Sequence, residues 1–532
     1  MKFAVYSLGS ILLVFLMTAC GSDDSADSGG SNDDADDDTD DGLADDDADD
    51  DADDDADDDA DDDTWAPLPD DDAVDDDSFA DDYVGAWPQS NVEPRDYDES
   101  IDAGPLREKA ADYDDWHVAW HQPDHGGTVG VTFTDETRTS LAGYRDWGDS
   151  SEWTGLYLGS QATRWYVTGD DDAKANALRT VAALDGYLRV TQTPGFLARY
   201  WGSQSSALYQ GDDWCDANSG CRRVESGPFA GDFWWGETSR DMYSGWFFGM
   251  SLAYDLLDDD DARATIREDV IDILDTLIAQ RWTILDEEGE PTDYAPDVLP
   301  PFRISWLTVG YHITGEERFK VELQKWLRNR SRGALRASTI SFFNRYMDYF
   351  GNCLSHETWY NLLRLGKVYF SPDDYAFLLD VFNTQVHSFT RLSHNPWFNA
   401  VFMGQGGYDP ARDDPYRTQL VEDLTDFWDA PHARYFLEPR DPSTYDLDPV
   451  SVLLHDLVTT IPLLGELLGN VSPQAKDPFP VREQCPADFM FQWSPFTIDA
   501  CGEDAPEKVD PGVDYLIPYW LASYHKFLAK DE

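Results

Sequence analysis

Three short polar segments gather acidic and basic side chains immediately before apolar, helix-like patterns. They are Asp149-Ser150-Ser151-Glu152, Glu237-Thr238-Ser239-Arg240-Asp241 and Asn352-Cys353-Leu354-Ser355-His356-Glu357. A pair of carboxyl groups can supply the acid and the base that cleave a glycosidic bond. We therefore expect Asp241 and Glu357 to form a catalytic pair, with Asp149 as a third acid in the same site.

Residues beside these acids have the chemistry of substrate ligands. Arg240 and His356 each adjoin one acid and are candidates to bind an acidic or hydroxyl-rich substrate, and Glu237 belongs to the same group. If the reaction is an elimination, Tyr243 or His356 is the candidate base. Arg240 would then neutralise a uronate.

Tryptophan residues lie close to two of the polar segments. Aromatic side chains line small-molecule sites, and their faces stack on sugar rings. Trp147, Trp153 and Trp235 are therefore expected to rim the pocket. The alternative is that these side chains fill the core, which is the commoner place for a large aromatic residue.

The same acids also suit the ends of helices. Thr238 and Asp241 have nearly the spacing of a capping box, and Asp149 or Ser150 is a ready N-cap. Acidic residues in a first turn also interact favourably with the helix dipole. Capping is thus the structural alternative to catalysis for these residues.

Periodic apolar stripes indicate the helices that must hold these segments. One helical face carries Ile266, Val270, Ile273, Leu274, Leu277 and Ile278. Similar stripes cover residues 178–188, 246–257 and 375–386, and strand-like alternation is rare. Short loops join many of the stripes, so neighbouring helices are expected to be antiparallel. The sequence predicts an all-α fold.

A degenerate repeat links the predicted helices. Trp165-Tyr166-Val167-Thr168-Gly169-Asp170 recurs as Tyr311-His312-Ile313-Thr314-Gly315-Glu316. In each copy aromatic residues end one helix, Gly turns the chain, and an acid opens the next helix. Repeated helical hairpins over about 300 residues favour a closed ring or a solenoid over a four-helix bundle.

Three motifs resemble those of six-hairpin glycosidase-like proteins. They are Thr168-Gly169-Asp170 with the helix after it and Pro194-Gly195-Phe196-Leu197-Ala198-Arg199, then Ser239-Arg240-Asp241-x-Tyr243-x-Gly245-x-Phe247-Phe248-Gly249, and the repeat at residues 311–316. The resemblance runs from about Asp146 to Phe402. It implies an (α/α)6 toroid of helical hairpins with long irregular loops and a cleft on one face. Many such toroids hydrolyse or cleave glycans, but a fold does not fix the chemistry.

Other ligand-like patterns are weaker. His117, His121 and His125 have the four-residue spacing of ligands on one helical face, but Pro123 and the glycines at 126 and 127 interrupt that helix. No phosphate-binding loop, dinucleotide fingerprint or serine nucleophile elbow occurs in the sequence. We expect no metal and no cofactor.

The charge of the chain excludes one class of partner. The 532 residues carry 106 acidic and 38 basic side chains, a formal net charge of −68, and 33 Asp lie within the first 90 residues. Such a field repels phosphate backbones, so nucleic-acid binding is not expected.

Aromatic residues make up 14% of the chain, which is enough apolar surface for a large core.

The first 19 residues have the pattern of an export signal. Lys2 precedes an apolar run over residues 3–17, and small residues lead to Cys20. This junction resembles the lipobox of bacterial lipoproteins, which implies that Cys20 is lipidated and anchors the mature chain to the cell envelope. Gly21 after the cysteine favours the outer membrane. A secretory signal cut before Cys20 without lipidation is the alternative.

Residues 20–85 are predicted to be a disordered acidic tether. Repeated Asp with almost no apolar side chains cannot offset the entropy of ordering, and like charges extend the chain. The alternative is that the tract binds calcium. Such binding would be weak and diffuse, because no calcium-binding loop motif is present. Residues 86–532 are then the helical domain, with irregular extensions at both ends.

Six cysteines fit an oxidising compartment. With Cys20 lipidated, Cys215 and Cys221 can close one small loop, and Cys485 and Cys501 another. Cys353 is left as a buried thiol.

The sequence thus predicts an exported glycan-cleaving enzyme, either a hydrolase or a lyase. A non-catalytic glycan-binding lipoprotein and a structural envelope protein are the alternatives.

Overall fold

The computed structural model describes most of the chain after residue 100. The described residues are 83–87, 101, 103–218, 220–286, 288–328, 331–339, 342–346, 349–461, 463–465, 471–485 and 493–529. They all belong to one compact unit, Asp76–Glu532. The predicted export signal, Cys20 and the acidic tether up to residue 82 lie outside the described residues.

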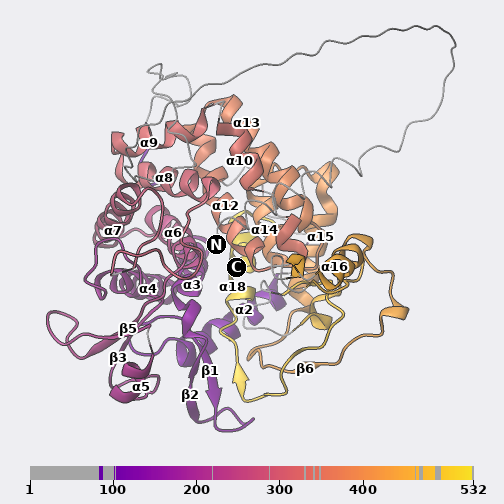
Figure 1. The fold of residues 1–532 in the computed structure, drawn as a ribbon, viewed down its shortest axis with the longest axis horizontal. Coiled ribbons are helices and arrows are strands. Elements are labelled where there is room, and N and C mark those ends of the chain that lie inside the picture. Colours follow the sequence, from indigo (N-terminus) through magenta and orange to yellow (C-terminus); the bar gives the residue numbers. More distant parts are fainter. Residues whose placement is uncertain are drawn as a thin grey trace, which may run out of the picture. The chain divides into compact units, whose positions relative to one another are not determined.

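Most of this unit is α-helical, as the apolar stripes predict, and its helices are paired along the chain (Figure 1). The pairs in contact are α3 (Ser150–Thr168) with α4 (Asp171–Arg189), α6 (Arg240–Leu256) with α7 (Asp260–Ala279), α8 (Pro300–Thr314) with α9 (Glu317–Leu327), α12 (Gly351–Tyr369) with α13 (Pro372–Val381), and α14 (Pro396–Gln405) with α15 (Pro410–Asp426). The last helix, α18 (Val513–Tyr524), packs against the first, α2 (Gly104–Trp116).

The first member of each pair also packs against its counterpart in the next pair. Contacts run from α3 to α6, α8, α12, α14 and α18 in turn, and α18 returns to α3. These helices are buried around much of their circumference, since in α3 every residue from Ser150 to Thr163 is buried. Such helices need apolar or small residues on several faces, not on one stripe.

Glycines make the closest of these helix contacts possible. A Cβ atom on Gly245 would lie 2.4 Å from the backbone oxygen of Glu152, and one on Gly155 would lie 1.9 Å from the oxygen of Gly245. Gly249 faces the oxygen of Gly155 in the same way. The backbones of α3 and α6 therefore touch directly, and this contact holds the start of α3 beside the start of α6.

The hairpin turns have the structure that the repeat predicts. Gly169 and Gly315 end α3 and α8 with positive φ values of 72° and 67°. In the turn before α7, Asp259 accepts a hydrogen bond from the Ala262 amide, and before α13 Ser371 accepts one from Asp374. These side chains cap the helices that follow them.

Short antiparallel strands, which the sequence analysis did not predict, lie among the long loops. One sheet joins β2 (Leu141–Arg145), β1 (Gly130–Phe133) and β8 (Lys508–Val509), a second joins β3 (Tyr200–Ser203), β5 (Asp232–Trp235) and β4 (Cys221–Arg223), and β6 (Phe436–Leu437) pairs with β7 (Cys501–Gly502). Disulfides link Cys215 to Cys221 and Cys485 to Cys501, the two pairings that the spacing suggested.

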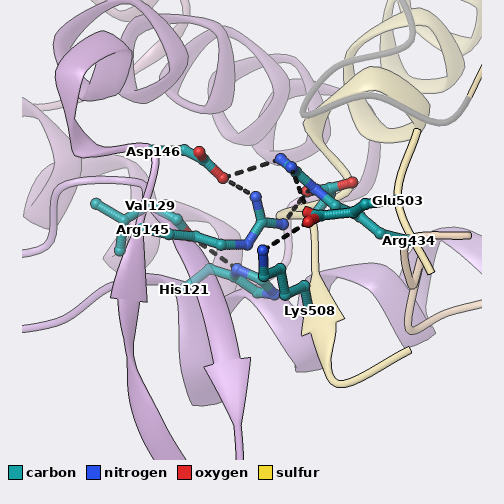
Figure 2. Close-up of polar contacts among 8 residues, drawn as sticks. His121, Val129, Arg145, Asp146, Arg434, Glu503 and Lys508 are labelled. Atoms are coloured by element: carbon teal, nitrogen blue, oxygen red, sulfur yellow. Dashed lines mark hydrogen bonds and ion pairs between the residues drawn. The ribbon is translucent and has the colours of Figure 1, made fainter. Parts of the chain in front are cut away.

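A charged network connects the first sheet to the C-terminal part of the chain (Figure 2). Arg434 pairs with Asp146 at 3.1 Å and with Glu503 at 2.9 Å, and Lys508 pairs with Glu503 at 2.7 Å. Arg145 contacts Asp146 from the other side. Distant segments of sequence are thereby joined beside β1 and β2.

The remaining elements are short. The helices are α5 (Asp212–Ala217), α10 (Arg332–Ser338), α11 (Phe342–Tyr346) and α16 (Pro449–Thr460), with π-helical turns at His117–His121 and Phe382–Val386 and 3-10 turns at Trp147–Asp149, His387–Phe389, Pro442–Thr444 and Val481–Glu483. Among the described residues, no helix is both long enough and apolar enough to cross a membrane.

Candidate functional site

The structure brings the three predicted acids together, along with a fourth. Asp149 immediately precedes α3, Glu152 lies in the first turn of α3, and Asp241 is the second residue of α6. Glu357 lies in the second turn of α12, because that helix begins at Gly351 and not after Glu357 as predicted. Glu357, Asp241 and Asp149 all act electrostatically on Glu152, so the three helices deliver their carboxyl groups to one site.

The four acidic side chains differ in their exposure to solvent. The Asp149 side chain is 39% exposed, and Asp241 is also partly exposed. Glu152 and Glu357 are 0% and 1% exposed. Two acids are thus open to solvent, while two lie in the protein interior.

The two buried acids form a tight group with Cys353. One oxygen of Glu152, one oxygen of Glu357 and the sulfur of Cys353 all lie within 4.8 Å of one another. The Cys353 thiol donates to Glu357 Oε1 at 3.0 Å. Neither oxygen of Glu152 has a hydrogen-bond partner of good geometry among the described residues, and neither has Glu357 Oε2.

Burial and like charge favour the protonated forms of these groups. Burial, reinforced by the neighbouring Glu357, raises the pKa of Glu152 well above its ordinary value. Burial also raises the pKa of Glu357, and the hydrogen bond from Cys353 offsets part of that rise. Because the two carboxyl groups are adjacent, they titrate as a pair that retains a proton more readily than an isolated acid.

Arg199 binds Asp149 and joins the chain segments that lead into α3 and α6. Its guanidinium donates to Asp149 Oδ1 at 3.1 Å and to the Gly148 carbonyl at 2.8 Å, just before α3. It also donates to the Glu237 carbonyl at 2.6 Å and to Ser239 Oγ at 3.0 Å, just before α6. One side chain therefore fixes the approach of the chain to both helices.

The ion pair with Arg199 also affects Asp149 electrostatically. Burial raises the pKa of Asp149, the Arg199 charge lowers it, and the nearby Asp241 raises it again. The net direction is upward. Asp149 is consequently a weaker acid than an isolated aspartic acid despite its cationic partner.

The helix-capping alternative does not describe these residues. Asp149 and Ser239 occupy the N-cap positions of α3 and α6, and neither side chain makes a capping hydrogen bond. Thr238 Oγ1 has no hydrogen-bond partner among the described residues. The acids at these helix starts are therefore not used as caps, in contrast to Asp259 and Ser371 in the hairpin turns.

An aromatic group adjoins the partly exposed acids. Trp147, two residues before Asp149, packs edge-on against Trp235 with ring centroids 4.1 Å apart, and Trp214 lies 5.9 Å from Trp235. All three tryptophans are partly exposed. Trp153, the third predicted rim residue, is instead 1% exposed and belongs to the core.

Two predicted substrate ligands are turned into the protein. His356 is fully buried, with Nδ1 2.7 Å from the Asn352 carbonyl and Nε2 3.2 Å from Thr390 Oγ1. Burial lowers the pKa of His356 to about 3. Tyr243 is 1% exposed, and its hydroxyl donates to the Gly195 carbonyl. The sequence prediction is wrong in placing both at a substrate surface, because their helices bury that face.

Arg240 and Glu237 lie beside the acids without joining the buried group. Arg240 donates to the Asp297 carbonyl at 2.9 Å and lies over the Phe302 ring, and with Phe302 it lines a pocket of about 120 Å³. Glu237 is partly exposed in a left-handed conformation with φ of 54°. The Arg240 side chain therefore faces α8.

The three spaced histidines do not converge on one point. His117 Nδ1 lies 3.0 Å from the Pro511 carbonyl, His121 Nδ1 lies 2.8 Å from the Val129 carbonyl (Figure 2), and His125 stacks on Trp201. Each ring has its own partners in the fold. Among the described residues, the one group of side chains with metal-ligand geometry is Glu152, Cys353 and Glu357.

Sequence reasoning missed Glu152, Arg199 and Trp214. Glu152 follows Asp149 by three residues, which places it one turn along the same helical face. This spacing could have identified Glu152 as a residue of the site. Arg199 and Trp214 lie in a long connection that has no periodic pattern. Nothing in the sequence indicates that this connection folds back on the starts of α3 and α6.

Comparison with known proteins does not assign this chain to a family. The sequence matches no protein-family model, and no curated protein is significantly similar to it. Function is therefore inferred from the geometry of the site.

Proposed function

We propose that this protein is an exported enzyme that cleaves glycosidic bonds of a poly- or oligosaccharide by carboxylate acid–base chemistry. The observation that carries the proposal is the convergence of Asp149, Glu152, Asp241 and Glu357 from three separate helices. Gathering like charges costs stability, so such clusters occur most often where the charges have a chemical role.

The fold that we propose is an (α/α)6 toroid. Its support is the order of helix contacts, in which α3, α6, α8, α12, α14 and α18 pack in turn and α18 returns to α3. The motifs that resemble six-hairpin glycosidase-like proteins point to the same arrangement. In such a fold the six inner helices begin at one end, and the proposal is supported by acids that lie just before α3 or within the first two turns of α3, α6 and α12.

The residues then have distinct roles. Asp241, being partly exposed, serves as the base or nucleophile, and Glu357 serves as the proton donor. Asp149 is the third acid and, with Arg199, orients the substrate beside Asp241. Trp147, Trp214 and Trp235 provide the stacking surface for sugar rings.

Anchoring at the envelope is part of the proposal. Lipidated Cys20 holds the chain at the membrane, and residues 20–82 act as the spacer that carries the catalytic domain away from it. At about 3.3 Å per extended residue, the spacer can reach on the order of 100 Å or more. The enzyme can then act on glycans beyond the membrane surface.

A panel of oligosaccharides tests the proposed activity. The full chain is incubated with neutral and acidic glycans, and both new reducing ends and unsaturated products are scored, which separates hydrolysis from elimination. Asp241→Asn and Glu357→Gln are expected to lower the rate about 10²–10⁴-fold, while Asp373→Asn, an exposed acid in a hairpin turn, leaves it unchanged. Full activity in both site variants refutes the proposal.

The second candidate is a glycan-binding lipoprotein without catalysis. The observation in its favour is that the tryptophan group is partly exposed, whereas Glu152 and Glu357 are buried. Binding of a panel member with no product, lost on Trp235→Ala and kept in Asp241→Asn, distinguishes this function from the first.

A further inference from the structure

The group formed by Glu152, Cys353 and Glu357 has a donor set that suits a metal ion. Two carboxylates and a thiol converge from two different helices, with one donor atom of each inside 4.8 Å of the others. Cys353 and Glu357 are four residues apart on α12, so both face the same direction. Carboxylate oxygens with a thiolate sulfur are ligands of Zn²⁺ and related divalent ions.

A separate observation concerns the oxygens of the two carboxyl groups, of which Glu357 Oε1 accepts a hydrogen bond from the Cys353 thiol. Both oxygens of Glu152 are buried without a hydrogen-bond partner of good geometry among the described residues, and so is Glu357 Oε2. Buried polar atoms are nearly always bonded, and these two carboxyl groups have only each other and the Cys353 thiol, an arrangement that a bound cation would satisfy. No lysine or arginine among the described residues forms an ion pair with either glutamate.

The charge around the group favours a cation. Asp149 and Asp241 act electrostatically on Glu152, and Arg199 pairs with Asp149. The acids of the site thus outnumber the cations that pair with them among the described residues. A divalent ion can replace the protons that the buried carboxyl pair retains, and the partly exposed Asp149 and Asp241 offer it a first contact with solvent.

We propose that Glu152, Cys353 and Glu357 bind one divalent transition-metal ion of the Zn²⁺ class. Zn–S and Zn–O bonds are about 2.3 and 2.0–2.2 Å long, which places tetrahedral ligand atoms about 3.3–3.8 Å apart. The Cys353 sulfur and Glu357 Oε1 lie 3.0 Å apart, and an oxygen of Glu152 lies within 4.8 Å of both side chains' donor atoms. Binding releases the thiol proton and any proton held by the carboxyl pair, so the ion replaces protons.

The inference goes beyond the proposed function and has a separate test. A bound ion occupies Glu357, so Zn²⁺ is expected to inhibit glycan cleavage. Metal binding is measured without any glycan, so its failure leaves the proposed cleavage intact. If no glycan is cleaved, the metal-binding measurement still tests the metal site independently.

Co²⁺ titration tests the site, with a readout specific for sulfur. The protein is the full chain carrying Cys20→Ser, so that Cys353 is the one cysteine outside the two disulfides. One Co²⁺ per chain is expected to give the near-ultraviolet thiolate charge-transfer band. The acidic tether has no thiol, so ions bound there give no such band.

Matched variants decide the outcome. Cys353→Ser is expected to remove the band, and Glu152→Gln to weaken Co²⁺ binding at least about 10-fold, as loss of a ligand does. Glu225→Gln, an exposed glutamate, leaves binding unchanged. Circular dichroism verifies that each variant is folded. Absence of the band in the parent, or equal affinity in parent and Glu152→Gln, overturns the proposal.

Discussion

Helices α6 and α12 each carry charged residues near both ends, and the two ends are built in opposite ways. Near their starts, Asp241 and Glu357 belong to the acid site. Near their ends, Asp255 of α6 and Arg364 of α12 form an ion pair, and both side chains are 0% exposed. The same two helices therefore carry one cluster of like charges and one cluster of balanced charges.

The balanced cluster satisfies nearly every donor and acceptor. Asp255 Oδ1 accepts from His312 Nε2 at 2.7 Å and from the Trp87 amide at 2.9 Å. Arg364 also donates to Ser251 Oγ at 2.5 Å. Burial alone raises the pKa of Asp255, but His312 and Arg364 together outweigh burial and lower it. At the other end, the pKa of Glu152 is raised.

This difference separates residues that stabilise the fold from residues that the fold tolerates. A buried ion pair with complete hydrogen bonding holds its elements in register. Buried carboxyl groups without a cation destabilise the folded state and persist where function needs them.

Arg364→Met should give the largest loss of stability. The substitution leaves Asp255 as a buried charge with its main partner removed, and breaking such a pair costs about 3–5 kcal/mol. Urea unfolding followed by circular dichroism measures the change. Arg318→Met, which removes partly exposed ion pairs of α9 with Asp275 of α7 and with Glu316, should cost less than about 1 kcal/mol. Equal effects of the two variants would contradict the contrast.

Gly245→Ala should come next, because it disturbs the helix contact that assembles the acid site. The new methyl group meets the Glu152 backbone, and overpacking of this kind costs about 1–3 kcal/mol. Forcing α3 from α6 should also weaken Co²⁺ binding. Gly143→Ala is the matched control, since its Cβ meets nothing within 4 Å. A Gly245→Ala protein with parental stability and Co²⁺ affinity would show that the close contact is not needed.

Glu152→Gln should have the opposite sign to Arg364→Met. In the presence of a chelator, a neutral amide at this position removes the cost of keeping a carboxyl group protonated in the folded protein, so the protein should be stabilised by about 1–2 kcal/mol at neutral pH. Thermal unfolding provides the measurement, with Glu225→Gln expected near zero. Saturating Zn²⁺ should reverse the order, because it stabilises only a chain that binds it.

The pH dependence of stability should differ between the two ends. The folded pKa of Asp255 is lowered, so its contribution is present above its unfolded pKa of about 3.9 and is lost as the pH falls below that value. The folded pKa of Glu152 is raised, so its contribution is present below about 4.3 and is lost as the pH rises through the folded pKa.

Denaturant unfolding across this pH range separates the two cases. Asp255→Asn should flatten the acid limb, and Glu152→Gln, with chelator present, should flatten the decline toward neutral pH. Each difference should stay below about 1.4 kcal/mol per pH unit, the limit for one titrating group. If the free energy of unfolding of Glu152→Gln changed with pH in the same way as that of the parent, Glu152 would not be one of the groups that titrate in this range.

Much of the helical framework can be predicted from the sequence, because buried helices leave a local signal. The apolar stripe of residues 266–278 lies within α7, and the repeated Gly turns occur at Gly169 and Gly315. Strands β3, β4 and β5 have only three or four residues each, which is too short for a clear alternating pattern.

The acid site was predicted in part. Residue type and position at helix starts identified Asp149, Asp241 and Glu357. Burial could not be predicted, because whether His356 faces solvent depends on helices that pack against it from elsewhere in the chain. Arg199 is positioned by a fold-back of the loop after α4, which is a long-range contact without a local sequence pattern.

Asp241→Asn, compared with the parent on a cleaved glycan, tests whether the acid site is catalytic. The initial rate is measured at a temperature where both proteins are fully folded, with Asp255→Asn assayed alongside at the same folded fraction. We expect the rate to fall at least about 10²-fold in Asp241→Asn with unchanged unfolding. In Asp255→Asn we expect a lowered unfolding midpoint with near-parental turnover. Parental turnover in Asp241→Asn would contradict a catalytic role for the acid site.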